Sequence, residues 1–183
     1  AMVNQEMLSW ACAHAQNTDQ DLLELYCGMG NFTIPLSKHY RRVLATEVSK
    51  VATRAAQDNL VLNEVDNVAF ARLAAEEVTQ ALNGDREFRR LKPLDPPLND
   101  YDLATVFVDP PRAGLDDGTK RLCQKFNQIL YISCNPLSLI DNLKSLSVTH
   151  RIEALAVFDQ FPYTHHLECG ISLIRRGLHE STN

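Results

Sequence analysis

Short apolar runs alternate with amphipathic segments along most of the chain, and this alternation constrains the fold more than any other feature of the sequence. Runs such as DLLELY (residues 21–26) and ILYIS (residues 129–133) are apolar nearly throughout, which is typical of strands buried on both faces. Between them lie segments with helical spacing, such as KVATRAAQDNLVLN, which begins just after Ser49, its expected N-cap. Alternating strands and helices predict a mostly parallel sheet covered on both faces.

Seven apolar runs are expected to form the strands of this sheet. The last two are joined by a loop too short for a crossover helix, so they should pair antiparallel. The predicted strands cover residues 21–26, 42–48, 67–73, 102–111, 127–133, 150–159 and 168–176. Further helices are predicted over residues 74–83 and 136–146, with Pro136 in the first turn of the second. The sequence predicts a Rossmann-like α/β fold, with a mostly parallel seven-stranded sheet and an antiparallel C-terminal strand, in one domain over residues 1–183.

The composition is that of an ordinary globular chain. Hydrophobic residues make up 45% of the positions, and no apolar run approaches the roughly 18 residues that a membrane span needs. The first residues lack the basic start and the apolar block of a signal peptide. Five widely spaced cysteines without a CxxC pair argue against a disulfide framework and favour a reducing cytoplasm. The net charge of −5 does not indicate a nucleic-acid binder, so local patches or another segment would have to attract RNA.

One stretch, NGDREFRRLKPLDPPLND (residues 83–100), breaks the alternation with prolines and a cluster of arginines. Prolines in such number are typical of loops rather than of helices or strands. The stretch is open to two interpretations: a solvated surface loop, or an RNA-facing loop that uses Arg86, Arg89 and Arg90.

A glycine turn in LELYCGMGNF follows the first predicted strand. Gly28 and Gly30 let the chain turn tightly and approach a ligand closely, and the next helix would point free N–H groups at that ligand. G-x-G without a third glycine is a weak signal alone. Glu47 strengthens it, because an acidic residue at the end of the second strand typically binds ribose hydroxyls. The pattern predicts an adenosine cofactor at the carboxyl edge of the sheet, and both NAD and S-adenosylmethionine fit such a pocket.

The fourth predicted strand ends in Asp109, which is followed by two prolines and Arg112. Consecutive prolines fix the backbone and remove two N–H donors, so they would hold Asp109 rigidly where ligands bind in such sheets. Hydride transfer has no need of this feature, and the motif therefore favours S-adenosylmethionine over NAD.

A lone cysteine ends the fifth predicted strand, in ILYISCNP. Cys134 is either a small packing residue or a nucleophile aimed at the carboxyl edge. The later segment FDQFPYTHHLECG would bring Glu168 to the same edge. A thiolate that adds to uracil C6 makes C5 nucleophilic toward a methyl donor, and a carboxylate such as Glu168 can then remove the C5 proton. The alternative is a zinc site with the ligands Cys134, His165, His166 and Cys169.

Five motifs together resemble those of the RNA uracil-5-methyltransferases over residues 2–176: LELYCGMGNF, LATE, VDPPRAGL, YISCNP and FDQFPYTHHLECG. The last motif is most similar to that of the bacterial enzymes that act on tRNA, and it is less decisive against relatives that act on ribosomal RNA. The resemblance implies a class I S-adenosylmethionine-dependent methyltransferase domain that uses no metal and releases S-adenosylhomocysteine. Its implied product is ribothymidine in the tRNA T-loop, with tmRNA as a further substrate, no membrane partner and a cytoplasmic location.

The resemblance also implies a role for each matching residue. Cys134 is the nucleophile and Glu168 is the proton-abstracting base. Glu47 binds the ribose of the cofactor, and Asp109 lies beside the cofactor and the target base. The other implied cofactor-binding residues are Tyr26, Gly28, Gly30 and Asn31.

Three further expectations come with the resemblance. A T-loop uridine is stacked and must be flipped into the pocket, where Phe161, Tyr163 or His165 is expected to stack on it. Arg112 after Pro111 fits uracil, since the cytosine enzymes resembling this fold place a second cysteine there. The family's N-terminal RNA-binding region is expected to lie before Ala1.

Two functions of other classes remain as alternatives. The glycine turn with its acidic partner is also found in NAD-binding dehydrogenase domains. An RNA-binding module without catalytic activity is the second alternative, and the presence of both Cys134 and Glu168 speaks against it.

Overall fold

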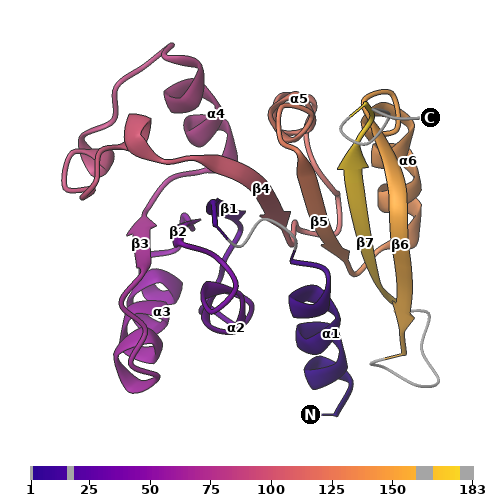
Figure 1. Cartoon of the computed structure of the whole chain (residues 1–183), viewed down its shortest axis with the longest axis horizontal. Coiled ribbons are helices and arrows are strands. Elements are labelled where there is room, and N and C mark those ends of the chain that lie inside the picture. The colour runs from indigo at the N-terminus through magenta and orange to yellow at the C-terminus, as the bar shows by residue number, and fades with distance from the viewer. Residues whose placement is uncertain (1, 16–18, 160–166, 178–183) are drawn as a thin grey trace.

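The structure is a computed structural model that describes residues 2–15, 19–159 and 167–177. Within these residues, seven strands form one sheet with helices on both of its sides (Figure 1). The strands are β1 (Asp21–Leu25), β2 (Arg42–Thr46), β3 (Val68–Ala71), β4 (Leu103–Val108), β5 (Gln128–Ser133), β6 (His150–Phe158) and β7 (Glu168–Arg175). The helices are α1 (Met2–Ala13), α2 (Thr33–Ser37), α3 (Lys50–Leu62), α4 (Ala75–Asn83), α5 (Asp117–Cys123) and α6 (Pro136–Leu146).

The strand order is β3-β2-β1-β4-β5-β7-β6. The first five strands are mutually parallel, and β7 runs antiparallel to both β5 and β6. The chain moves outward from β1 to β3 and then restarts on the other side of β1 with β4. The carboxyl ends of β1 and β4 therefore form the topological switch point, where ligands bind in open α/β sheets. The predicted fold, with its antiparallel C-terminal pairing, is confirmed.

Most predicted elements lie within a few residues of their observed bounds. Helix α6 spans the predicted residues 136–146, with its proline in the first turn, and the Ser49 hydroxyl caps α3 by accepting a hydrogen bond from the Ala52 amide (3.2 Å). Helices α1 and α5 were not predicted. In α1 only Met7 and Ala11 are fully buried, so its apolar pattern is weak. No helix in the described ranges is long and apolar enough to cross a membrane.

Two hydrophobic clusters attach the helices to the two faces of the sheet. Helices α1 and α2 pack on one face, for example through Met7 and Leu36 against Phe107 of β4. Helices α4, α5 and α6 pack on the other face, for example through Leu122 against Val106 of the same strand. Burial on both faces explains the nearly continuous apolar runs in the central strands.

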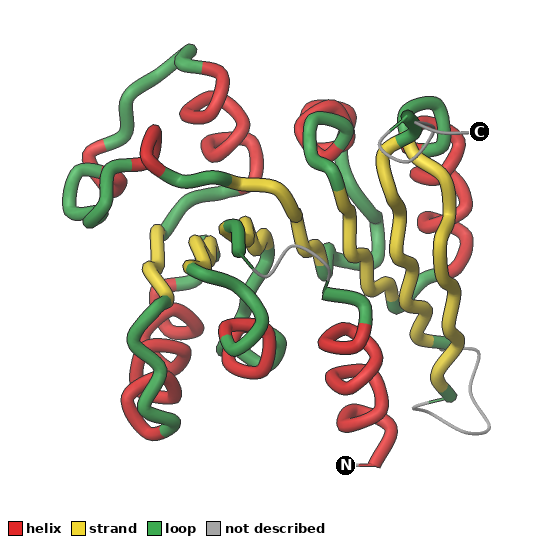
Figure 2. The backbone as a smooth tube through the Cα atoms, viewed as in Figure 1, coloured by secondary structure: helices red, strands yellow, loops and turns green. Residues whose placement is uncertain are grey.

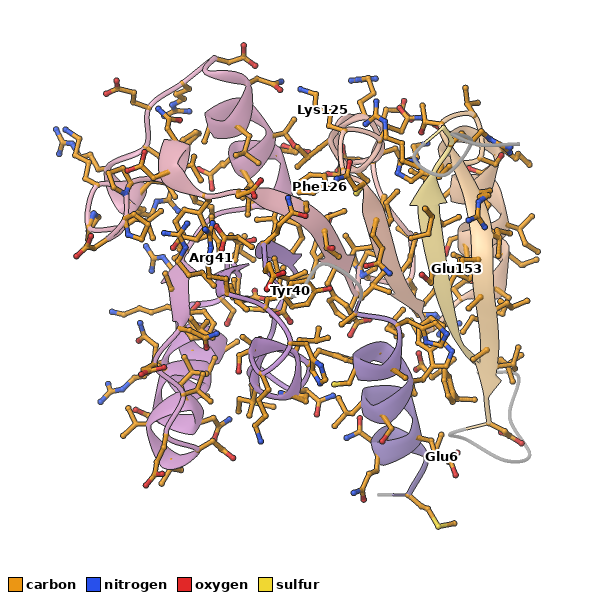
Figure 3. All side chains as sticks on the ribbon, in the orientation of Figure 1. Glu6, Tyr40, Arg41, Lys125, Phe126 and Glu153 are labelled. Carbon is orange, nitrogen blue, oxygen red and sulfur yellow. The ribbon has the colours of Figure 1, made fainter. Side chains whose placement is uncertain are left out.

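An ion cluster around a buried carboxylate fastens the amino edge of the sheet, opposite the switch point. Asp21, the first residue of β1, is fully buried and accepts hydrogen bonds from Arg41 (2.9 and 3.0 Å), Arg42 (2.8 and 3.2 Å) and the Asp102 amide (2.7 Å). Arg41, labelled in Figure 3, lies just before β2 in the chain. These bonds to the charged form lower the pKa of Asp21 to about 2 against the effect of its burial.

The proline-rich stretch between α4 and β4 forms two short 3₁₀ turns, Arg89–Leu91 and Leu98–Asp100, joined by loops (Figure 2). It is not wholly solvated. The Arg90 guanidinium pairs with the Glu77 carboxylate of α4 (2.9 Å) and also donates to the Arg72 carbonyl. Arg86 stacks on the ring of Phe88, with 4.8 Å between the guanidinium carbon and the ring centre. The stretch is thus a loop folded against the domain, and its use in RNA binding stays a prediction.

Candidate active site

The glycine turn lies at the switch point, between β1 and α2. Tyr26, Gly28 and Gly30 all have positive φ, at +59°, +55° and +86°. The Tyr26 conformation is uncommon for a residue with a side chain and is characteristic of functional turns. A Cβ on Gly28 would have no atom within 4 Å, so that side of the turn is open to a ligand.

Glu47 follows β2 and holds the glycine turn in place. Its Oε2 accepts a hydrogen bond from the Gly28 amide (3.1 Å), and its Oε1 accepts from the amides of Val48 (2.8 Å) and Ser49 (2.9 Å). A carboxylate has about four lone-pair positions, so these three bonds leave room for a ribose hydroxyl. The residue therefore supports the turn and is also placed to meet a ligand.

A hollow of about 80 Å³ lies beside this carboxylate, and it is lined by Tyr26, Thr46, Glu47, Val48, Leu73, Ala74 and Ala75. Its lining is mostly apolar and its rim carries a carboxylate, so it can contact part of a nucleoside, but it is too small to enclose a base and a ribose. The open glycine turn adjoins it. Asn31, in contrast, is exposed, exchanges side-chain hydrogen bonds with Asn4 (3.1 and 3.3 Å) and lines a separate hollow toward α1.

A second group of side chains gathers where β4 and β5 end and β7 begins. Asp109 follows β4, Cys134 follows β5, and Glu168 opens β7. In the β5–β7 ladder Ser133 lies opposite Cys169, so the next step of the antiparallel register places Cys134 opposite Glu168. The structure thus brings the predicted nucleophile and the predicted base to one strand end.

The charges of this group act on one another. Burial raises the pKa of Asp109 to about 7, and the negative charge of Glu168 adds to the rise. Burial also raises the pKa of the Cys134 thiol, as do the charges of Glu168 and Asp109, while the Arg112 guanidinium lowers it. Cys134 is partly exposed, as an attacking thiol has to be.

Glu24, a residue that the sequence analysis did not single out, completes the acidic group from β1. Its side chain is 1% exposed. Its Oε2 has no hydrogen-bond partner among the described residues. Burial raises the pKa of Glu24 to about 8, and the negative charge of Asp109 adds to the rise. The Thr33 hydroxyl lowers the pKa and so partly opposes the effect of burial. A glutamate inside the apolar run LLEL is the feature of the sequence that could have revealed this residue.

Two other contributors were also missed. Gly170 of β7 lies under Trp10 of α1, where a Cβ would come within 2.7 Å of the indole ring, so the helix and the start of β7 fit only with glycine. Asn135, the residue after Cys134, donates a hydrogen bond from its side-chain Nδ2 to the Arg112 carbonyl (2.9 Å). Both lie within two residues of a predicted catalytic side chain.

Several predicted residues fall outside the described part of the chain, namely Phe161, Tyr163, His165 and His166. The stacking role and most of the zinc alternative therefore stay untested. Within residues 2–15, 19–159 and 167–177, no group of three His, Cys, Asp or Glu side chains is placed to hold a metal ion.

A Rossmann-like sheet with an antiparallel seventh strand, a glycine turn and an acidic residue after β2 defines the class of S-adenosylmethionine-dependent methyltransferases. The solved structures that it resembles agree. A tRNA (uracil-54, C5)-methyltransferase from Pyrococcus abyssi, in complex with S-adenosyl-L-homocysteine, aligns with a TM-score of 0.73 and 26% identity over 93% of this chain and 38% of that one. A precorrin-6y C5,15-methyltransferase from Geobacter metallireducens aligns with a TM-score of 0.63 and 15% identity over 93% of this chain and 89% of that one, which supports the fold alone.

Within that class, residues 1–176 match the tRNA (uracil-5-)-methyltransferase family, and the chain belongs to it. It is 58% identical over 173 residues to a tRNA/tmRNA (uracil-C(5))-methyltransferase of Acinetobacter baylyi, covering 94% of this chain and 48% of that protein. It is 57% identical over 176 residues to a protein of the same name from Dickeya chrysanthemi, covering 96% and 47%. The chain thus spans about half the length of the curated relatives it matches.

Proposed function

We propose that this chain is the catalytic domain, over residues 1–183, of an enzyme that methylates C5 of a uridine in the tRNA T-loop. The observation that carries the proposal is the register of β5 and β7, which sets Cys134 opposite Glu168 at the edge that also bears the glycine turn. The names of the relatives, which give tRNA and tmRNA, support the choice of substrate.

S-adenosylmethionine, when bound, supplies an electrophilic methyl group. The residues present fit part of its nucleoside end, since the open side of Gly28 leaves space for a ligand and the small hollow beside Glu47 offers a carboxylate and apolar contacts. Tyr26 lines that hollow. We propose that Asp109, at the switch point, lies between the cofactor and the base. Because burial and the charge of Glu168 raise its pKa to about 7, part of the population is protonated near neutral pH and can donate as well as accept a hydrogen bond.

The protein's part in the chemistry is an addition followed by an elimination. The Cys134 thiolate forms a bond to C6 of the uracil, and the electron pair of the C5–C6 double bond moves to the O4 enolate, which makes C5 nucleophilic. After C5 has gained its methyl group, Glu168 takes the C5 proton. The double bond then re-forms and the sulfur leaves C6 as the thiolate, so the enzyme returns to its starting form.

The test uses a T-loop RNA hairpin with 5-fluorouridine at the target position, incubated with the protein and S-adenosylmethionine. Fluorine cannot leave as a proton does, so the covalent intermediate should persist and appear as a protein–RNA–methyl species in an intact mass spectrum. Cys134→Ala should abolish the adduct. Glu168→Gln should trap a methylated adduct even with ordinary uridine, because the final proton transfer is blocked. Normal turnover by that variant would exclude Glu168 as the base.

Two controls separate the alternatives. Calorimetry with S-adenosylhomocysteine and with NADH distinguishes a methyltransferase from a dehydrogenase domain, and binding of NADH alone would overturn the proposal. The amount of adduct formed with a ribosomal RNA hairpin, compared with that formed with the T-loop hairpin, shows which RNA the protein prefers. Adduct formation also excludes a module that only binds RNA.

We place the reaction in the cytoplasm, because all five cysteines are free, as expected in a reducing compartment.

A further inference from the structure

The turn after β4, which carries the two prolines and Arg112, is fastened to the helix that follows the nucleophile. Asn135 caps α6, where its Oδ1 accepts a hydrogen bond from the Leu137 amide (3.1 Å). The other end of the same side chain, Nδ2, donates to the Arg112 carbonyl (2.9 Å). One side chain, next to Cys134 in the sequence, thus joins the helix cap to the neighbouring turn.

A second asparagine of α6 fastens the far end of that turn. Asn142 is buried, and its Oδ1 accepts hydrogen bonds from the Leu115 amide (2.7 Å) and the Tyr131 hydroxyl (2.8 Å). The fit is close at Gly114, where a Cβ would lie 2.7 Å from the Asn142 Oδ1. The turn is therefore held at two points, and its position relative to the nucleophile is set by α6.

The position of Arg112 has a consequence for the thiol. Three charged groups act on Cys134 among the described residues: Glu168 from β7, Asp109 at the end of β4, and Arg112 from the turn. The two carboxylates oppose formation of a thiolate, whereas the guanidinium favours it. A shift of the turn away from Cys134 would leave the opposing charges in place and remove the favourable one.

We propose that Asn135 is a positioning residue, which holds the Arg112 backbone, and with it the turn after β4, so that the charge of Arg112 continues to favour the Cys134 thiolate. The proposal rests on the proposed function, in which this thiolate is the nucleophile. The Asn135 side chain then has two tasks: Oδ1 caps helix α6, and Nδ2 holds the turn whose charge acts on the reactive thiol.

Asn135→Ser separates these two tasks. Serine is as good an N-cap as asparagine, carries no charge and has no amide to reach the Arg112 carbonyl. The midpoint of urea unfolding should therefore stay near that of the wild type. Arg112→Gln removes the guanidinium itself, and the double variant completes a thermodynamic cycle. Asn135→Asp, which keeps the cap but loses the donor and adds a negative charge, is the second test variant.

The measurement is the rate at which iodoacetamide alkylates Cys134 between pH 6 and pH 10, followed by peptide mass. Cys12, the other partly exposed cysteine, serves as an internal reference. A rise of about half a pKa unit in Asn135→Ser would lower the rate at pH 7 about threefold, because the thiolate is the reacting form. Asn135→Asp should lower it further, and Asn135→Ser should have almost no effect when Arg112→Gln is already present.

Two results would overturn the proposal. An unchanged pH profile in Asn135→Ser would show that the bond to the Arg112 carbonyl does not matter for the thiol. A threefold loss that persists in the Arg112→Gln background would show that Asn135 acts independently of the guanidinium. Alkylation needs neither RNA nor cofactor, so the coupling can be found even if the fluorouridine adduct never forms, and that combination would reject the proposed function alone.

Discussion

Glu24 should destabilise the folded chain at neutral pH, and Glu24→Gln should remove this penalty. The side chain is 1% exposed, and burial raises its pKa from 4.5 to about 8. Between these values the folded chain holds a proton that the unfolded chain has lost. The free energy of unfolding therefore falls as the pH rises through this window, and the penalty is complete once the pH exceeds the folded-state pKa.

The size of the effect follows from the width of the window. Each pKa unit corresponds to about 1.4 kcal/mol, so at pH 7, about 2.5 units above the unfolded value, the penalty is about 3 kcal/mol. At pH 5 it is only about 1 kcal/mol, and near pH 4 it vanishes. A glutamine amide has the shape of the protonated acid, and its Nε2 can donate to the neighbouring hydroxyl of Thr33.

Urea unfolding of the wild type and Glu24→Gln at pH 5, 6, 7 and 8 measures this directly. The variant should be the more stable protein, by a margin that widens by roughly 1 kcal/mol per pH unit up to about pH 8. Glu87→Gln, at an exposed position, is the matched control and should change nothing. A margin that is the same at every pH, or a variant that is less stable at pH 7, would refute the reasoning, because either result means that Glu24 is not held protonated.

Three further outcomes are expected. Asp21→Asn should cost about 2 kcal/mol at neutral pH by breaking the ion cluster around the buried carboxylate. Because the folded pKa of Asp21 is about 2, acid unfolding of the wild type alone should show the loss of this stability as the pH falls from about 4 to 2. Gly170→Ala should lower the thermal midpoint by forcing a Cβ against Trp10, with partial rescue by Trp10→Leu. Arg90→Ala should weaken S-adenosylhomocysteine binding severalfold in calorimetry, whereas Arg89→Ala should not. Arg90 pairs with Glu77 near the start of α4, beside the hollow proposed to contact the cofactor.

Local signals were enough to predict the elements that carry the site. Some residues favour one backbone conformation by their own chemistry, namely the glycines of the turn, the proline at the start of α6 and the Ser49 cap. The turn and the two helix starts could therefore be predicted from a few neighbouring residues alone. The alternation of apolar runs predicted the sheet for the same reason. Helix α1 could not be found this way, because its few buried residues are explained by contacts with elements elsewhere in the chain, namely α2, β6 and β7.

The individual hydrogen bonds between motifs could not be predicted from the sequence. That Glu47 would bind the Gly28 amide as well as face a ligand depends on the distance between two loops. The same holds for the bond from Asn135 to the Arg112 carbonyl, which joins residues 23 positions apart. Spacing along the chain carries no information about such contacts, since they are set by how strands order themselves in the sheet.

The antiparallel direction of β7 is what allows the proposed base to meet the proposed nucleophile. Cys134 lies after the end of β5, whereas Glu168 lies at the start of its strand. Had β7 joined β5 in parallel, Glu168 would lie at the amino edge of the sheet, about 20 Å from the thiol, since β5 has six residues at about 3.3 Å each. The reversed strand brings its first residue to the carboxyl edge instead. The C-terminal hairpin, whose antiparallel pairing was predicted from the sequence, is therefore the part of the fold that brings the proposed base to the proposed nucleophile.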